Sequence, residues 1–179
     1  QRQMCIRDST QVAGNITLGT DATLEIELGG TERGNEYDSV TVTGNSSLDG
    51  ILDIRRINGF MPSEDDRFLV LETRQHTGQF DSITNLDLTE ILTLHPTWDA
   101  DGLSLTALDK YPWHNYSSIH DVNADGHISP KDAIYVINQI NEGESEALAW
   151  PRPNGKEVPY YDVNRDGISS PIDALTVIN

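Results

Sequence analysis

The chain has 179 residues and is strongly acidic, with 29 Asp and Glu residues against 12 Lys and Arg residues and a formal net charge of -17 at pH 7. Its length allows one or two domains, and so acidic a surface argues against binding to nucleic acids or anionic lipids. No run of about 18 apolar residues is present, so the sequence predicts no membrane insertion, and cations are the partners that its charge favours.

The first nine residues are set apart from the fold interpretation. Residues 1–9 (QRQMCIRDS) resemble a translated sequencing adaptor, which has no structural meaning. The chain also starts without an initiator Met and stops at Asn179 inside a helical pattern. We therefore expect a fragment that is truncated at both ends.

Between residues 10 and 110, apolar and polar residues alternate in short runs. Such alternation, bounded by Gly, Asn, Asp or Pro, is typical of half-buried strands. The alternating apolar residues are Leu24, Ile26 and Leu28; Val40 and Val42; Leu52 and Ile54; Phe68 and Val70; Leu92 and Leu94; and Leu103 and Leu105. This part of the chain is predicted to be mainly β.

A short repeat lies within the same region. The segment Val12–Asn15 (VAGN) recurs thirty residues later as Val42–Asn45 (VTGN), and Leu18 is matched by Leu48. Self-similarity at a fixed spacing is expected where β-coils stack on one another. The repeat therefore favours a solenoid.

The β region as a whole resembles the C-terminal end of bacterial right-handed β-helix proteins of the passenger-like or adhesin-like kind. The segments that carry the resemblance are Tyr37–Gly44, Leu48–Ile54, Arg67–Leu71, Gly78–Asp81 and Asp101–Thr106. The resemblance implies that residues 10–110 are the capping end of a longer solenoid whose functional face lies upstream. A β-sandwich explains the same alternation and remains the alternative.

The character of the sequence changes at Lys110–Tyr116, where alternation stops and Pro and aromatic residues cluster. Such a cluster is typical of a loop between domains. Residues 111–118 are predicted to be a linker, followed by a second domain over residues 119–179.

The second domain contains a twelve-residue acidic loop twice. Asp121–Asp132 (DVNADGHISPKD) recurs 41 residues later as Asp162–Asp173 (DVNRDGISSPID). Calcium prefers about six to eight oxygen ligands, so a tight loop must turn alternate side chains inward, and Gly at position 6 permits the bend. Side chains at positions 1, 3, 5 and 12 would supply oxygens, together with the position 7 carbonyl, of His127 or Ile168, and a water held by position 9. The duplication predicts two calcium ions.

Each loop leads into a predicted helix. Ser129 and Ser170 occupy the N-cap position, Pro follows at the first helical position, and the last Asp of each loop lies three residues after the cap. We expect an apolar stripe on each helix to pack against the other helix, formed by Ala133, Ile134, Ile137 and Ile140 and by Ala174, Leu175 and Ile178.

A third acidic segment, Asp99–Gly102 (DADG), has a similar local sequence. If its two acids stood at positions 3 and 5, Thr97 would occupy position 1 and Leu108 position 12, and neither residue fits a metal loop. It is predicted to be a hairpin turn.

The duplicated unit of a loop and an exit helix resembles type I dockerin modules over residues 119–179. Proline residues before each loop leave no room for the entering helix of an ordinary EF-hand. The resemblance implies folding coupled to calcium and a cohesin-like or cell-surface protein as partner. Its implied side-chain ligands are Asp121, Asn123, Asp125, Asp132, Asp162, Asn164, Asp166 and Asp173.

Three loop positions depart from the dockerin pattern, and one of them is position 8 of the second loop, where Ser169 replaces the usual apolar residue. Loop positions 10 and 11, which commonly form a small hydroxyl pair that selects the cohesin, are Pro130-Lys131 and Pro171-Ile172. Calcium binding does not depend on this pair, but the choice of partner does. The partner and the oligomeric state therefore remain open.

The function predicted is a non-catalytic, calcium-binding docking module attached to a secreted β-helix protein, with a role in protein–protein or cell-surface anchoring. The alternative is the C-terminal fragment of a polysaccharide-degrading enzyme, a glycoside hydrolase or lyase, whose catalytic part lies upstream. No catalytic residue is predicted in these 179 residues. Calcium loops that stay filled suit millimolar extracellular calcium, so an extracellular or cell-surface location is expected.

Overall fold

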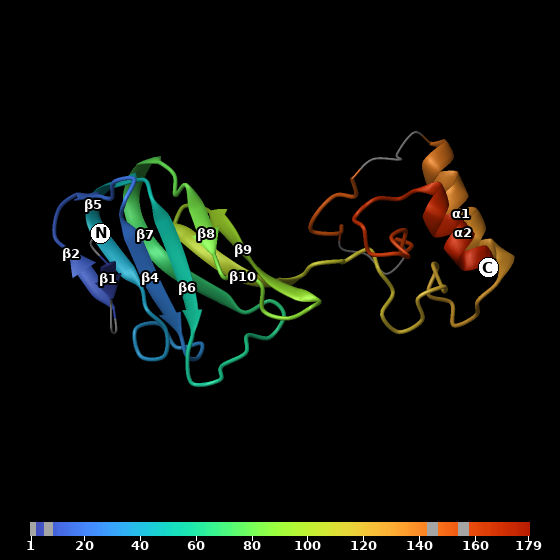
Figure 1. Cartoon of the computed structure of the whole chain (residues 1–179), viewed down its shortest axis with the longest axis horizontal. Helices are drawn as coiled ribbons and strands as arrows, with labels where there is room; N and C mark the ends of the chain where they lie inside the picture. The colour runs from blue at the N-terminus through green and yellow to red at the C-terminus, as the bar shows by residue number, and fades with distance from the viewer. Residues whose placement is uncertain (1–2, 6–8, 143–146, 154–157) are drawn as a thin grey trace. The chain divides into compact units, whose positions relative to one another are not determined.

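The computed structural model describes residues 3–5, 9–142, 147–153 and 158–179. The chain divides into two compact units, Gln1–Asp109 and Lys110–Asn179 (Figure 1). Of the adaptor-like residues 1–9, residues 1–2 and 6–8 lie outside the described residues, and Gln3–Cys5 form strand β1. Neither helix in the described part of the chain has the length and apolar character needed to cross a membrane.

The first sheet of the N-terminal unit has four strands in the order β1-β4-β6-β8. Every neighbouring pair in it is parallel. After β1, its strands are β4 (Thr23–Leu28), β6 (Ile51–Arg56) and β8 (Ser82–Thr84).

The second sheet has the strand order β2-β5-β7-β10-β9, with β3 paired to β5. The pairs of β2, β3 and β7 with β5 are parallel, whereas β10 is antiparallel to both β7 and β9. Its strands are β2 (Thr10–Val12), β3 (Ile16–Thr17), β5 (Val40–Leu48), β7 (Arg67–Gly78), β9 (Leu92–Trp98) and β10 (Leu103–Asp109).

From β2 to β8 the chain passes back and forth between the two sheets and adds a parallel strand at each pass. In the second sheet Val40 pairs with Thr10 on one side and with Leu71 on the other. In the first sheet Ile51 pairs with Thr23 and with Ser82. Successive passes therefore stack on one another, unlike the antiparallel pairing of the sandwich considered from the sequence.

The core lies between the two sheets. The alternating residues of β4 and β6 and those of β5, β7 and β10 belong to one buried cluster. Its fully buried members include Ile26, Leu52, Val40, Phe68, Val70 and Leu105. The period-two alternation in the sequence thus marks the inner face of each sheet.

The two copies of the short repeat lie side by side. Val12 pairs with Val42, and the Asn45 N–H donates to Asn15 Oδ1 at 2.9 Å. At Gly44 a Cβ atom would lie 2.3 Å from that same Oδ1, so only glycine allows the two passes to approach so closely. The repeat is therefore explained by stacking in register.

The hairpin turn predicted at Asp99–Gly102 is confirmed. It joins β9 to β10, whose pairing begins at Trp98 and Leu103. The Asp99 N–H donates to the Gly102 carbonyl at 3.0 Å, and the Asp101 N–H donates to Asp99 Oδ1 at 2.8 Å. This acidic segment belongs to the β unit.

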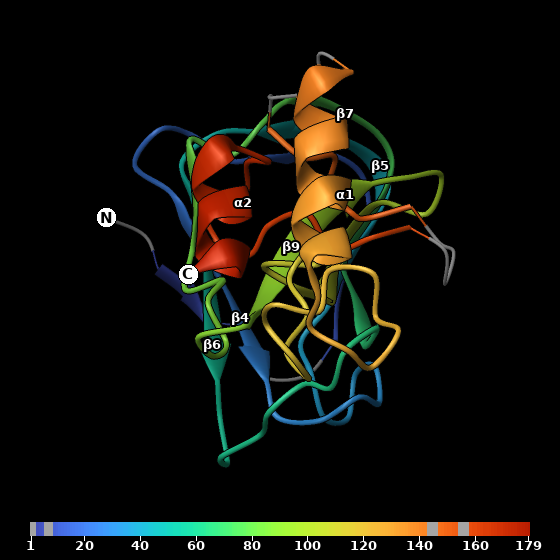
Figure 2. The ribbon, with the colours of Figure 1, turned by 90° about the vertical axis from the view of Figure 1, so that its right-hand side faces the viewer.

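In its described residues the C-terminal unit has the helices α1 (Pro130–Asn141) and α2 (Pro171–Ile178). They lie side by side in both views of the ribbon and contact each other (Figure 2). The segment predicted as a linker, residues 111–118, is packed into this unit, because Trp113, His114 and Asn115 are buried.

The apolar stripe predicted for the helices is wrong in part. Ile134 and Ile137 on α1 and Leu175 and Ile178 on α2 are exposed. The buried cluster is instead built from small branched and methyl side chains, namely Val122, Val136, Val163 and Ala174. Val122 and Val163, at position 2 of each loop, pack in one cluster with Val136 of α1 and Ala174 of α2. The buried face of each helix is therefore not the predicted stripe.

Candidate metal centres

The first acidic loop is closed by its own side chains. Asp121 accepts hydrogen bonds from the Asp125 N–H at 3.1 Å and from the Gly126 N–H at 2.9 Å. Asn123 Oδ1 accepts from the Asp125 N–H at 3.0 Å, and Asp125 Oδ1 accepts from the His127 N–H at 2.9 Å. The side chains at positions 1, 3 and 5 are thus held within the concave side of the turn.

The second loop repeats these contacts position by position. Asp162 accepts from the N–H groups of Asp166 and Gly167, both at 2.9 Å. Asn164 Oδ1 accepts from the Asp166 N–H at 3.0 Å, and Asp166 Oδ1 accepts from the Ile168 N–H at 2.9 Å. Two sequences that differ at positions 4, 7, 8 and 11 therefore adopt the same loop.

Position 6 needs glycine for its backbone conformation. Gly126 has φ of 86° and Gly167 has φ of 78°, in the left-handed region. A Cβ atom at either position would meet no other atom within 4 Å, so packing does not select glycine there. The requirement comes from the bend that closes the loop.

The last Asp of each loop ties the start of the loop to the start of a helix. Asp132 Oδ2 accepts from the Ser129 N–H at 2.8 Å, and its Oδ1 accepts from the Asn123 N–H at 3.2 Å. In the second loop, Asp173 accepts from the Ser170 N–H at 2.9 Å and from the Val163 N–H at 2.8 Å. Each carboxylate belongs both to the helix cap and to the loop.

The first and last carboxylates of both loops are buried. The exposed fractions are 3% for Asp121, 0% for Asp132, 1% for Asp162 and 0% for Asp173. No Lys or Arg side chain in the described ranges forms an ion pair with any of the four. Buried aspartates are rare unless a positive charge accompanies them, so these pairs favour a bound cation.

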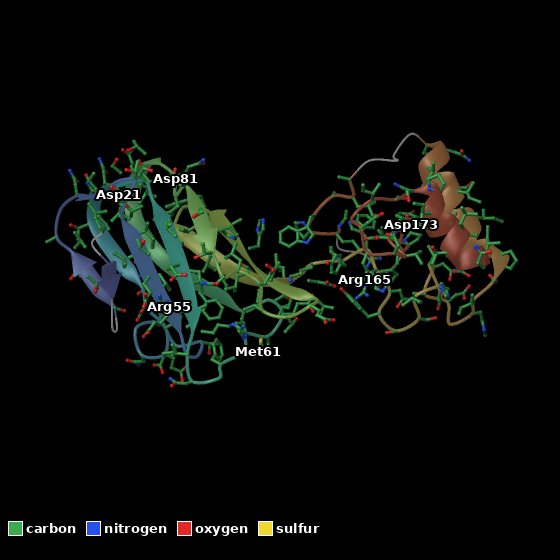
Figure 3. The ribbon with its side chains drawn as sticks, viewed as in Figure 1. Asp21, Arg55, Met61, Asp81, Arg165 and Asp173 are labelled. Atoms are coloured by element: carbon green, nitrogen blue, oxygen red, sulfur yellow. The ribbon has the colours of Figure 1, made fainter. Side chains whose placement is uncertain are left out.

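The electrostatics of the second loop point the same way. Burial raises the pKa of Asp162, and the neighbouring Asp173 and Asp166 charges raise it further, although N–H donors from Gly167 and Asp166 oppose the shift. Figure 3 labels Asp173 near the N-terminal end of α2. A divalent cation among these oxygens would offset the repulsion between the carboxylates.

In the first loop, Asp125 at position 5 is more exposed. Its carboxylate accepts from Asn123 Nδ2 at 2.8 Å, and Lys131 Nζ lies 3.8 Å from it. The hydrogen bond from Asn123 is the main reason why the pKa of Asp125 is lowered. This carboxylate is therefore ionised at neutral pH and available to a cation.

The oxygen donors of both loops fit calcium by their chemistry. Carboxylates, asparagine amides and backbone carbonyls are hard ligands of the kind that calcium takes. Within the described ranges, no three His, Cys, Asp or Glu side chains form a group that could by themselves hold a metal ion. The amides of Asn123 and Asn164 and the carbonyls at position 7 are further oxygen donors in these loops.

Ser169, at position 8 of the second loop, is an exception to good hydrogen bonding. Its side chain is fully buried, and its Oγ has no hydrogen-bond partner among the described residues. Burial of an unsatisfied hydroxyl costs about 1–3 kcal/mol. Ser169 therefore destabilises the fold, and it is not a proposed ligand.

Replacing Ser169 by Ala is expected to stabilise the C-terminal unit by about 1 kcal/mol, because it removes that unsatisfied group. The neighbouring Ser170→Ala is a matched control that should destabilise the unit by about 1 kcal/mol, because Ser170 is the N-cap of α2. Urea unfolding in saturating calcium measures both. A loss of stability in Ser169→Ala would contradict the assignment.

Sequence reasoning missed a part of this unit that lies before the first loop. Trp113, His114 and Asn115 are buried, and all three hydrogen-bond to residues of the loops or their connector. The cluster of aromatic residues with Pro112 is the available signal, although on its own it indicates a linker. These residues support the loops and are not metal ligands in this arrangement.

Comparison with protein families agrees with the pattern of loops and helices. Residues 119–179 match the family model of the dockerin type I domain, which confirms the resemblance inferred from the sequence. No curated protein matches the chain. Type I dockerin domains are non-catalytic docking modules that bind calcium and cohesins and occur in extracellular or cell-surface proteins.

Proposed function

We propose that residues 119–179 are a docking module that binds two calcium ions, one in each twelve-residue loop, and thereby presents α1 and α2 to a partner protein. The observation that carries the proposal is the pair of buried carboxylates at positions 1 and 12 of each loop, which lack a Lys or Arg partner among the described residues. Calcium bound there would supply the missing positive charge and cross-link the loop to its helix.

The ligand set follows from the loop positions. Side chains at positions 1, 3, 5 and 12 would bind directly, and the position 7 residue would bind through its carbonyl. In the first loop the ligands are Asp121, Asn123, Asp125, His127 and Asp132, and in the second they are Asp162, Asn164, Asp166, Ile168 and Asp173.

The partner would contact the apolar side chains that the two helices expose. Ile134 is 52% exposed and Leu175 is 55% exposed, at equivalent positions of α1 and α2. Leu175 also lines a groove of about 360 Å³. Its lining residues are Ile137, Ile140, Asn141, Pro171, Ala174, Leu175 and Ile178. Apolar side chains that remain exposed on a small acidic domain are typical of a protein-binding surface, so a cohesin-like or cell-surface protein is the proposed partner.

A panel of immobilised cohesin modules tests the docking function. The full chain should bind at least one module in calcium and lose that binding when a chelator is added. Binding that persists in the chelator would contradict calcium-dependent docking. Failure to bind every module while both ions are bound would contradict cohesin recognition.

The variant that combines Ile134→Asp with Leu175→Asp is expected to weaken this binding by about 100-fold or more, because contacts at the centre of an interface contribute about 2 kcal/mol each. Ser117→Asp adds one of these two negative charges at an exposed position outside the helices and serves as control. Surface plasmon resonance measures the affinities. Equal affinity of the double variant and the control for the partner would contradict a binding surface at Ile134 and Leu175.

The N-terminal unit is proposed to be the C-terminal end of a β-solenoid in the host protein. The parallel stacking of successive passes supports this proposal, and the antiparallel pair β9 and β10 would cap the stack. The docking module would then anchor a secreted host protein, since millimolar extracellular calcium keeps such loops filled.

A further inference from the structure

The segment Trp113–Asn115 precedes the residues that match the dockerin model, yet it lies inside the C-terminal unit. The exposed fractions are 8% for Trp113, 5% for His114 and 9% for Asn115. Two of these side chains are polar, and each must therefore find a hydrogen-bond partner in the interior. Their partners are the first residues of the two loops.

Asn115 holds the first loop. Its Nδ2 donates to the Asp121 carbonyl at 2.7 Å. Its Oδ1 accepts from the N–H groups of Ser117 and Ser118 at 3.1 and 3.3 Å. The side chain is thereby fixed in one orientation, and it fixes the backbone of position 1 in turn.

His114 and Trp113 hold the second loop. His114 Nδ1 lies 3.0 Å from the Asp162 carbonyl oxygen. A carbonyl only accepts hydrogen bonds, so Nδ1 carries the proton and donates it. The Asp162 N–H in turn donates to the Trp113 carbonyl at 3.1 Å. Both backbone groups of position 1 in the second loop are therefore bound by this segment.

The segment is anchored independently of the loops' own hydrogen bonds. Trp113 Nε1 donates to the Ala149 carbonyl at 2.7 Å, and its ring stacks on Tyr161 with centroids 5.7 Å apart. The Arg152 guanidinium lies over the rings of both Trp113 and Tyr160. A rigid support of this kind can transmit order from one loop to the other.

A direct link between the loops lies beside it. The Tyr160 N–H, two residues before the second loop, donates to the Val122 carbonyl of the first loop at 2.8 Å. Ordering of either loop thus restricts the backbone of the other at its first ligand. Binding that orders a shared element lowers the entropic cost of the next binding event.

We propose that Trp113–Asn115 couple the two loops, so that calcium binding at one loop raises the affinity of the other. His114 and Asn115 act as positioning residues, and the dockerin module of this chain begins at Trp113 rather than at residue 119. This inference rests on the proposed binding of calcium by both loops. Coupling between sites of this kind is commonly about 5- to 150-fold in affinity.

A double-mutant cycle on the full chain, measured by calorimetric titration with calcium alone, tests the coupling. Asp162→Ala disables the second loop and should lower the calcium affinity of the first loop by about 5-fold or more. In the Asn115→Ala background the same substitution should change that affinity much less. Equal losses in the two backgrounds would contradict the coupling.

Controls separate coupling from a general loss of structure. His120→Ala and Asn138→Ala remove the same residue types from less buried positions of the same unit and should leave the coupling unchanged. His114→Asn, which keeps a donor near the place of Nδ1, should retain coupling that His114→Ala loses. Helical circular dichroism in saturating calcium reports whether each variant folds.

If Asn115→Ala does not fold in calcium, the comparison of His114→Asn with His114→Ala decides the question, since equal coupling in the two would overturn the proposal. Independent binding of two ions by the unmodified chain would also overturn it. Absence of any calcium binding would instead contradict the proposed function, and the two failures are therefore distinct.

Discussion

Removal of calcium by a chelator is expected to abolish the helical circular dichroism of this chain and to leave its β signal intact. Among the described residues of the C-terminal unit, the buried apolar cluster consists of Val122, Val136, Val163 and Ala174. Such a core is too small to offset the repulsion between buried carboxylates. Binding at about 1,000 times the dissociation constant stabilises a fold by about 4 kcal/mol per site, which makes calcium the main source of stability.

The measurement is ellipticity at 222 nm as the chelator is titrated and calcium is then restored. The N-terminal unit, with its own core, serves as an internal control and should unfold at the same temperature throughout. Magnesium should restore the helices poorly, because it demands a stricter octahedron. Helicity that does not change in the chelator would contradict folding coupled to metal.

Substitution of the two closing carboxylates is expected to have an effect of similar size. Asp132→Ala should eliminate calcium from the first loop and Asp173→Ala from the second, and the double variant should bind none. Loss of an outer-shell partner already lowers metal affinity by about 10- to 100-fold, and loss of a charged ligand should exceed that. Isothermal titration of each variant gives the number of sites.

Two further variants separate the roles of these carboxylates. Asp173→Asn keeps one oxygen, which can still accept from the Ser170 N–H at the start of α2. It removes the charge and the second oxygen, which accepts from the Val163 N–H, so it should weaken calcium binding more than helix capping. Asp101→Ala changes the similar acidic turn of the β unit and should have no effect on calcium. Unaltered stoichiometry in Asp132→Ala and Asp173→Ala would be incompatible with the proposed ligands.

The loops could be predicted because their determinants are local. The N-cap serine, the following proline and the closing Asp lie within four consecutive residues, and Gly126 and Gly167 supply the bend. All of these residues lie within the twelve residues of each loop, so a short sequence motif is enough to identify the loop. The number of bound ions and the ligand set remain predictions.

The helix faces and the supporting segment could not be predicted, because they depend on distant parts of the chain. Val136 is buried while Ile137 is exposed, since Val122 and Val163 of the loops select the face that turns inward. His114 meets Asp162 across 48 residues, and no local pattern contains such a contact.

For the β unit, alternation predicted strands but not their direction. The inner residues of β4 and β6, such as Ile26 and Ile54, would alternate in the same way in a parallel or an antiparallel sheet. Only the repeat at Gly14 and Gly44 pointed to parallel stacking, and those two residues do lie against each other. Whether two strands pair in parallel depends on the connection between them, and the alternation of apolar residues contains no information about that connection.

The most direct test of the account is a count of bound ions. The purified chain is dialysed to equilibrium against calcium, and the metal content per polypeptide is determined by mass spectrometry. We predict two calcium ions per chain, falling to one in Asp132→Ala or Asp173→Ala. A chain that holds no calcium at millimolar concentrations would contradict the account.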